Sequence, residues 1–397
     1  MKILFCVNSL GGFGGIERVT IVKANALAAI EGNEVGICYT DKGAYPETIH
    51  PLSLSVKVFG LNTPYWGFTS LSTIAKGFIP MVYRTRKALL KLIKSFRPDV
   101  IITTGSYEKF ALASIGLTRA MVRSSSATVG NTLIIREYHF NSNYRQYLGG
   151  SKINKLAGKA AEWFERSLLS RCFDKSFLLT KSDLNAHFKG KKKFSYMYNP
   201  SSFCPVEVAA YIDRPKVVLA VGRMVAQKNF EALIDIWSKA YSKAPGWKLR
   251  IIGDGSDMGV LKQLVKKRGL EDFVELPGKS SHVEKEMDSA QIYAMTSRYE
   301  GFPLVLLEAQ SIGLPIVSFD TPYGPSEIVR HNKDGYIVGY NDCEAFANKL
   351  LEMIHNDTLR QQMSDNALKR SKEFTPEVIA DKWMDIYNGL LKEKYSK

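Results

Sequence analysis

The sequence is poor in cysteine, and its few cysteines lie far apart. Five occur among 397 residues, with no Cys-x-x-Cys pair and no histidine at metal-ligand spacing. This pattern argues against a disulfide framework and a structural zinc site. We therefore expect reduced thiols in the protein core at Cys6, Cys38, Cys172, Cys204 and Cys343.

Long hydrophobic runs are also missing. No stretch reaches the roughly 18 apolar residues that a membrane-spanning helix needs. The apolar run near the N-terminus covers five residues before Asn8 and Ser9. It is too short for the core of a signal peptide and is typical of a buried strand. These absences predict a cytoplasmic protein.

Acidic residues are scarce in the first half of the chain. Residues 1–200 contain 28 Lys and Arg against 12 Asp and Glu, whereas residues 201–397 contain 26 against 27. The net charge of +15 therefore comes from the first half. Such asymmetry favours an anionic partner for that half, either a membrane surface or a nucleic acid, with a well-solvated basic surface as the alternative.

What the sequence does contain is an alternation of short apolar runs with segments of helical periodicity. This alternation predicts α/β domains with doubly wound parallel sheets. A length of 397 residues is sufficient for two of them. In the first, residues 1–200, we expect strands at 2–8, 34–39, 55–60, 99–103, 132–136 and 176–180 and helices at 81–96 and 155–171.

A stretch without periodicity, rich in proline and serine, follows Tyr198 and runs to Pro215. It separates the first domain from a second αβα domain, residues 201–375. Residues 376–397 are expected to form an amphipathic helix that packs back across the junction. In the second domain we expect strands at 216–222, 248–253, 273–278, 291–297, 315–320 and 335–339 and helices at 229–243, 257–268 and 303–312.

Two glutamates flank a Gly-Phe-Pro turn in this second domain. Glu300 and Glu308 are separated by seven residues. Because proline favours the first position of a helix, Pro303 is expected to start one, with Glu300 in the loop before it and Glu308 inside it. The rise from Pro303 to Glu308 would be roughly 7.5 Å, so one carboxylate can meet a sugar while the other meets a ribose. The free N–H groups at the helix start would face the diphosphate or the hydroxyl groups.

Two cations follow the first strand of the second domain. In VGRMVAQKNF, Arg223 and Lys228 lie in the loop after the strand, and Asn229 is expected to cap the next helix. Ligands of open α/β sheets bind at the carboxyl ends of the strands. Arg can contact two phosphate oxygens at once, and Lys adds a point charge. The pair therefore indicates a diphosphate site.

A glycine-rich loop follows the first strand of the chain, in LGGFGGIER. Gly14 and Gly15 precede a predicted helix, and they allow the backbone to approach a ligand whose negative charge the helix start favours. The loop lacks the G-x-G-x-x-G spacing of a dinucleotide site. A phosphate cradle and a tight turn are both consistent with it.

These segments together resemble the retaining glycosyltransferases of the group 1 family, which have the GT-B fold. The resemblance covers nearly the whole second domain, where VGRMVAQKN, IIGDGSD, VELPGK, the run from Ser297 to Pro315, GPSEIV and DGYIV occur in the family's order. In the first domain it rests mainly on GGIER at 14–18 and, more loosely, on RPDVII at 97–102 and the Asn-Pro at 199–200. It implies two Rossmann-like domains that face each other across a cleft, the first binding the acceptor and the second the nucleotide sugar.

The resemblance also implies a role for each matching residue. Arg223 and Lys228 would hold the donor diphosphate, Glu308 the ribose hydroxyls, and Glu300 the sugar. The backbone of Gly301, Phe302 and Pro303 would contact the sugar as well. The other implied donor-binding positions are Gly14, Gly15, Gly222, Gly278 and Leu304.

Family members place a histidine of the first domain near the transferred sugar. In IIREYHFN the candidates are His139 and Glu137. Many relatives have adjacent Glu and His, whereas Tyr138 separates the two here. Both residues remain candidates.

The resemblance implies a hexosyltransferase. A retaining transfer of this type needs no nucleophile from the protein. The acceptor attacks on the face from which the diphosphate leaves, and stabilisation of the departing diphosphate is the main catalytic effect. The chain has no Asp-x-Asp motif. Arg223 and Lys228 are therefore expected to replace a metal, and no cofactor is expected.

The resemblance favours a UDP-sugar as donor, with GDP-mannose as the alternative, and a saccharide or lipid-linked saccharide acceptor in cell-surface polysaccharide synthesis. A non-hydrolysing sugar-nucleotide epimerase is the competing enzyme, but it would not be expected to have both the Gly-Gly-x-Glu-Arg loop and the spaced glutamates. The interpretation of the chain as a nucleic-acid-binding protein rests only on its basic composition, because no motif of that class occurs. Nucleic acid is thus not expected as a partner.

The stretch from Tyr65 to Arg97 predicts a basic amphipathic helix that docks on an anionic membrane surface, at the inner face of the cell membrane. Such a helix can lie in the headgroup plane with its apolar side down. The alternative is a core helix of the sheet, with Leu89, Leu92, Ile93 and Phe96 packed inside. The basic residues of the stretch are Arg84, Arg86, Lys87, Lys91, Lys94 and Arg97.

Overall fold

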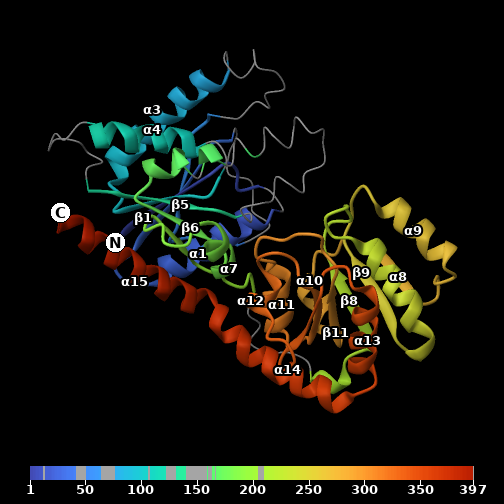
Figure 1. Ribbon diagram of the computed structural model, residues 1–397. Helices are drawn as coiled ribbons and strands as arrows, with labels where there is room; N and C mark the ends of the chain where they lie inside the picture. The colour runs from blue at the N-terminus through green and yellow to red at the C-terminus, as the bar shows by residue number, and fades with distance from the viewer. Residues whose placement is uncertain are drawn as a thin grey trace. The chain divides into compact units, whose positions relative to one another are not determined.

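The chain folds into two compact units, each described here by itself (Figure 1). Unit 1 comprises residues 1–200 and 376–397, and unit 2 comprises residues 201–375. The computed structural model describes residues 1–11, 14–41, 51–63, 77–105, 108–121, 131–139, 159, 163–165, 167–203 and 210–396.

Unit 1 contains a sheet of seven parallel strands in the order β3-β2-β1-β4-β5-β6-β7. The order reverses between β1 and β4, as in doubly wound folds. The strands are β1 (Lys2–Val7), β2 (Glu34–Tyr39), β3 (Lys57–Gly60), β4 (Val100–Thr103), β5 (Leu133–Glu137), β6 (Lys175–Leu178) and β7 (Phe194–Tyr196). The helices are α1 (Gly15–Ala29), α3 (Ile79–Phe96), α4 (Glu108–Met121), α7 (Lys181–His187) and α15 (Pro376–Tyr395), with a 3-10 turn at Leu169–Cys172.

The central strands β1 and β4 of unit 1 are almost entirely apolar because helices cover both faces of the sheet. Alternate residues point to opposite faces. Ile3 and Phe5 of β1 pack in a core with α1 and α15. Leu4 and Cys6 pack on the other side, in a core with α3 and α4.

Helix α3 settles one alternative left open by its sequence. Leu89, Leu92, Ile93 and Phe96 are buried in the core between the sheet and α4. The expectation that the apolar side of α3 faces a membrane is therefore wrong. The physical reason is that the sheet needs a helix to cover this face, and α3 has the apolar stripe that fits it.

Helix α15 belongs to unit 1 although it follows unit 2 in the sequence. Its Trp383 ring lies edge-on to Phe177 of β6 at 4.7 Å and stacks on Tyr387 at 5.3 Å. Both α15 residues are buried in the core shared with α1. The last helix of the chain thus completes the first core.

Unit 2 contains a sheet of six parallel strands in the order β10-β9-β8-β11-β12-β13. Its order reverses between β8 and β11. The strands are β8 (Val217–Val221), β9 (Lys248–Ile252), β10 (Val274–Gly278), β11 (Ile292–Met295), β12 (Ile316–Phe319) and β13 (Gly335–Val338). The helices are α8 (Phe230–Ala240), α9 (Met258–Lys267), α10 (Val283–Asp288), α11 (Leu304–Ser311), α12 (Pro325–Ile328), α13 (Cys343–Ile354) and α14 (Asp357–Ser371), with 3-10 turns at Tyr211–Asp213, Tyr241–Lys243 and Lys372–Phe374.

Most expected strands and helices occur within one or two residues of their expected bounds, and the helix expected at 155–171 lies partly outside the described residues. The sequence-based expectations did not include β7, α4, α7, α10, α12, α13 or α14. It was also wrong about Cys343, which is only half-buried at the start of α13, whereas Cys6, Cys38 and Cys172 are buried free thiols. Cys204 lies outside the described residues. Within the described parts of the chain, no helix is both long and apolar enough to cross a membrane.

Candidate active site

The strand order of unit 2 places two functional loops side by side. The loop after β8 carries Arg223 and Lys228, and the loop after β11 carries Glu300. Because β8 and β11 are neighbours where the strand order reverses, both loops lie at the carboxyl end of the sheet at the point where ligands of open α/β sheets bind. The residues that the sequence pairs by chemistry are therefore neighbours in the fold.

Hydrogen bonds hold these two loops together. The backbone N–H of Arg298 donates to the carbonyl of Gln227 at 2.8 Å, and the side-chain amide of Gln227 donates to the carbonyl of Tyr299 at 3.0 Å. The hydroxyl of Thr296 donates to the carbonyl of Asn229 at 3.1 Å. Lys228 and Glu300 are thus carried on backbones that cannot move independently.

Lys228 and Glu300 form an ion pair. The Nζ of Lys228 lies 2.7 Å from Oε1 of Glu300, and their side chains are 17% and 10% exposed. Gly222 makes room for this lysine, since a Cβ there would lie 3.1 Å from Lys228 Cε. Arg223 is exposed on the same loop. The loop thus offers one cation held by a carboxylate and one cation open to an anion.

Glu308 lies deeper, on the second turn of α11. It is 2% exposed, and its Oε1 accepts a hydrogen bond from the hydroxyl of Ser202. Burial raises the pKa of Tyr293 well above its ordinary value, and the charges of Glu308 and Glu300 raise it further. The pKa of this buried phenol on β11 therefore depends on both glutamates.

Tyr293 also fixes the end of β8. Its hydroxyl accepts from the backbone N–H of Val221 and donates to the carbonyl of the same residue, each at 3.2 Å. Val221 is the last residue before the loop that carries Arg223. Tyr293 therefore positions the start of the cationic loop, a role that no motif in the sequence indicated.

The Gly-Phe-Pro turn is held from two sides. Phe302 is 5% exposed and packs on Phe374, with 6.1 Å between ring centroids. Pro303 lies against Gly324, where a Cβ would come within 3.0 Å of the proline ring. The Phe302 side chain is committed to the core, so only the backbone of this turn is available to a ligand.

Pro303 is not the first residue of its helix, as the sequence predicted, but the residue before it. Its ψ of 100° is extended, and α11 begins at Leu304. Gly301 and Leu304 are half-buried on either side of the turn. The correction moves Glu308 to the fifth residue of the helix and leaves Glu300 in the preceding loop.

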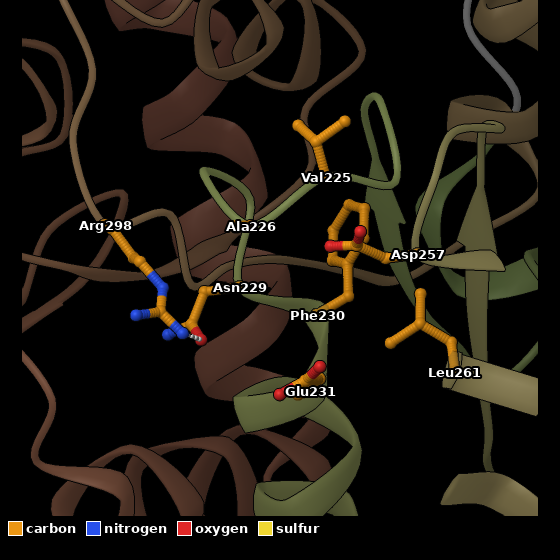
Figure 2. A pocket seen from close by; sticks show the side chains of 8 residues that line it. All are labelled: Val225, Ala226, Asn229, Phe230, Glu231, Asp257, Leu261 and Arg298. Atoms are coloured by element: carbon orange, nitrogen blue, oxygen red, sulfur yellow. Dashed lines mark hydrogen bonds between the residues drawn. The ribbon is translucent and has the colours of Figure 1, made fainter. Parts of the chain in front are cut away.

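Asn229 does not cap α8 with its side chain, contrary to expectation. Its φ of 53° is left-handed, and no side-chain cap is formed. A capping residue normally has extended dihedrals, which aim its oxygen at the helix N–H groups. Here the Asn229 oxygen instead accepts from Arg298 at 3.1 Å, the contact drawn in Figure 2.

The same figure shows a small cavity behind the cationic loop, lined by Val225, Asn229, Asp257 and Arg298 among others (Figure 2). Its volume is about 40 Å³, enough for a water molecule but not for a nucleotide sugar. None of the charged residues assigned to the donor lines it. It is a packing feature of the loop rather than the donor site.

Glycines of the neighbouring strand ends support the cationic loop. Gly253 has a φ of 145°, and a Cβ there would lie 1.9 Å from the carbonyl oxygen of Gly222. The N–H of Gly253 donates to the carbonyl of Gly278 at 2.8 Å. Gly278 ends β10, two strands away from β8. Gly278 therefore supports Gly253, and it lies away from the Lys228–Glu300 pair along the sheet.

In unit 1, Gly14 and Gly15 stand at the start of α1. Gly14 is the residue before the helix, and both glycines are exposed. Gly12 lies outside the described residues. The exposed backbone of this helix start has the free N–H groups that an anion can contact.

Glu137 ends β5 and His139 lies two residues further on, and both side chains belong to a buried charged cluster. Glu137 forms an ion pair with Lys23 of α1, and both side chains are 3% exposed. The Nε2 of His139 lies 3.4 Å from Oε2 of Glu137. Burial by itself would raise the pKa of Glu137, but Lys23 and His139 lower it to about 2. Burial lowers the pKa of His139, which favours its neutral form.

This cluster predicts how stability depends on pH. The pKa of Glu137 falls from 4.5 to about 2 on folding. The ionised carboxylate therefore stabilises the folded state above pH 4.5, and this stabilisation is lost as the pH falls toward 2. The lowered pKa of His139 acts in the same direction, because below pH 6.5 it also makes the folded state less stable as the pH falls. The free energy of unfolding of the natural chain should therefore fall more steeply below pH 4.5 than that of Glu137→Gln. Parallel curves for the two proteins would contradict this assignment.

Comparisons with known proteins find similarity to glycosyltransferases. Residues 208–370 match the family described as glycosyl transferases group 1. The amylovoran biosynthesis glycosyltransferase AmsD of Erwinia amylovora is 28% identical over 98% of this chain and 99% of its own length. An α-1,4-N-acetyl-D-galactosaminyltransferase of Campylobacter jejuni, named for an undecaprenol-linked saccharide, is 27% identical over 97% and 98%.

Solved structures show the same fold. The structure of TarM superposes with a TM-score of 0.77, at 17% identity over 98% of both chains. A further structure of TarM from S. aureus, determined in complex with UDP among other ligands, has a TM-score of 0.72 over 98% of this chain and 99% of its own. Residues 208–370 of this chain are thus similar to the group 1 glycosyltransferases, and the chain has the predicted GT-B fold. The alternative of a sugar-nucleotide epimerase finds no support in these comparisons.

Three contributors to the site were missed from the sequence. Tyr293 lies within a strand, and Ser202 lies in the aperiodic stretch between the domains. Lys23 lies in a helix whose other buried residues, apart from Thr20, are apolar. Only Lys23 left a signal, because a lysine on the buried stripe of a helix needs a buried partner.

Proposed function

We propose that the chain transfers a sugar from a nucleoside-diphosphate sugar to a saccharide or lipid-linked saccharide, with retention of configuration, in the synthesis of a cell-surface polysaccharide. The observation that carries the proposal is the Lys228–Glu300 pair beside exposed Arg223 at the reversal point of the unit 2 sheet. The relatives support the acceptor class, since one is named for amylovoran biosynthesis and one for an undecaprenol-linked saccharide.

In this proposal the cations act on the leaving group. Arg223 and Lys228 neutralise the diphosphate as its bond to the anomeric carbon breaks, and the acceptor hydroxyl forms the new bond on the same face. The hydroxyl proton passes to the departing phosphate oxygen. Preorganised charge aimed at the leaving group is the main contribution, and it requires no protein nucleophile. We propose that the two cations act without a metal or other cofactor.

Glu308 and Glu300 divide the recognition of the donor. Glu308 is buried in α11 and would accept hydrogen bonds from the ribose hydroxyls. Glu300, which is paired with Lys228, would contact the sugar. For Gly14, Gly15 and His139 of unit 1, contacts with the phosphate and the sugar are supported by the resemblance of the sequence to the family. A UDP-sugar is the favoured donor, in keeping with the UDP-bound structure of TarM, and GDP-mannose is the alternative.

The two acids should respond differently to substitution. Glu308→Ala is expected to weaken binding of both the nucleoside diphosphate and the nucleotide sugar, because a truncated partner leaves a buried group unsatisfied at a cost of about 1–3 kcal/mol. Glu300→Ala is expected to weaken the nucleotide sugar and to spare the bare nucleotide. Titration calorimetry with UDP and with UDP-sugars measures both. Equal loss of affinity for UDP in the two variants would count against the division.

Transfer itself is tested with a panel of UDP- and GDP-sugars, supplied with and without saccharide acceptors. Consumption of a donor that depends on an acceptor, with product of the same anomeric configuration, is the expected result. An inverted product would reject the retaining mechanism. A donor converted to its epimer without any acceptor would reject the transferase.

We further propose a cytoplasmic enzyme that works at the inner face of the cell membrane.

A further inference from the structure

Unit 1 exposes several large apolar side chains at the start of α3 and at positions 163, 164 and 168. Ile79 and Tyr83 of α3 are 67% and 66% exposed, Trp163 is 61% exposed, and Phe164 and Leu168 are 41% and 43% exposed. We call these five residues the apolar patch. Large exposed apolar surface of this kind marks a contact with another molecule or with a membrane.

The apolar patch surrounds a groove. Ile79, Tyr83, Phe164 and Leu168 line a hollow of about 700 Å³ between α3, α4 and the segment that leads to the turn at Leu169–Cys172. Phe78 and Phe110 meet edge to face at one wall, with 5.0 Å between ring centroids. The groove can therefore receive apolar groups without moving the core beneath it.

Positive charge continues from the apolar patch along α3. Arg84, Lys87, Lys91 and Lys94 are exposed on its outer face, and we call them the basic ridge. They line a second hollow of about 680 Å³, and Tyr83 belongs to both hollows. The helix contains no acidic residue that could neutralise them. Apolar and basic groups thus form one continuous surface.

We propose that this surface docks on an anionic lipid membrane. The apolar patch enters the headgroup region, and the basic ridge contacts acidic headgroups. A dissolved polyanion would use the ridge and leave the patch exposed, and a neutral apolar partner would use the patch and leave the ridge without counter-charge. An anionic membrane offers a match to both. The proposal goes beyond the transfer reaction and does not rest on it.

This contact differs from the one that the sequence indicated. The buried stripe of α3 takes no part, because it is occupied by the sheet. The apolar contribution comes instead from the first turns of α3 and from Trp163, Phe164 and Leu168. Two segments far apart in the sequence therefore act together, and each can be changed separately.

Co-sedimentation of the full chain with lipid vesicles tests the proposal. Binding is expected to phosphatidylcholine vesicles that contain phosphatidylglycerol, but not to phosphatidylcholine alone, and to weaken at high salt. Each basic residue near an anionic surface changes partitioning about fivefold, so the triple variant Arg84→Glu, Lys87→Glu, Lys91→Glu should bind on the order of 100-fold more weakly. The double variant Trp163→Ser, Phe164→Ser should bind about tenfold or more weakly with an unchanged salt dependence.

Matched controls come from α9 of unit 2. Lys262→Glu, Lys266→Glu, Lys267→Glu makes the same charge change on another exposed helix, and Val260→Ser removes an apolar side chain that is 51% exposed. Both should bind vesicles as the natural chain does, and circular dichroism should show unchanged folding in every variant.

Three results would overturn the proposal. One is equal binding to the two kinds of vesicle, and another is equal loss of binding in the α9 charge variant. The third is a Trp163→Ser, Phe164→Ser protein that binds vesicles normally while dextran sulfate competes for the ridge, which would assign the surface to a dissolved polyanion. The readout is membrane binding alone, so none of these results depends on whether the chain transfers a sugar.

Discussion

Turnover of the enzyme is expected to fall by tens- to thousands-fold when Lys228 or Arg223 is replaced by alanine. Loss of one preorganised charge partner of a developing anion typically costs about 2.7–4 kcal/mol of transition-state stabilisation. Lys228 is held by Glu300 at 2.7 Å, so it is in place before the donor arrives. The steady-state rate with the preferred sugar nucleotide measures the effect, and binding of the bare nucleoside should change far less.

Lys239→Ala provides the matched control. This lysine is exposed on α8 of the same unit and should be replaceable without loss of turnover. Circular dichroism should show that the Arg223 and Lys228 variants remain folded. Near-normal turnover in both of them would remove the diphosphate assignment, and with it the central argument for the proposed reaction.

Replacement of Lys23 by methionine is expected to lower the free energy of unfolding by about 3–5 kcal/mol, because breaking a buried ion pair from one side leaves a buried charge uncompensated. Lys23 is the cation that holds Glu137, and its Nζ also lies 5.3 Å from the centroid of the Trp383 ring. Urea unfolding, followed by tryptophan fluorescence, measures the loss.

Two further variants test whether burial of the charge is the cause. The double variant Lys23→Met, Glu137→Gln removes both charges and should recover a large part of the lost stability. Lys57→Met breaks an ion pair with Glu34 in which the lysine is 56% exposed, so its cost should stay below about 1 kcal/mol. A Lys23→Met protein as stable as Lys57→Met would show that the buried pair contributes little.

The predictable part of the site is the part written in motifs. Arg223, Lys228 and Glu300 stand out by residue type and by their place after apolar strands. Their contact does not, because it depends on β8 and β11 being neighbours, and strand order is a property of the whole sheet. Tyr293 was missed for the same reason, since its hydroxyl finds a partner only on the adjacent strand.

The elements that sequence patterns missed have weak patterns. Strand β7 is three residues long and follows a run of lysines, so no apolar run announces it. Helix α14 is polar along most of its length and buries Arg360 and Ser364 together with Met363. Arg360 is accepted inside because its guanidinium donates to the carbonyls of Met353 and Ile354 at the end of α13. Tertiary contacts, and not local periodicity, place such elements.

Because α15 contributes Trp383 and Tyr387 to the core that it shares with α1, the two units cannot mature in the order in which they are synthesised. A ribosome delivers residues 1–200 first, yet that portion lacks the helix that closes one face of its sheet until the last residues emerge. Unit 2 is contiguous in sequence and can complete its own core sooner. A chain that still lacks residues 376–397 would therefore expose an apolar sheet face that α15 otherwise buries.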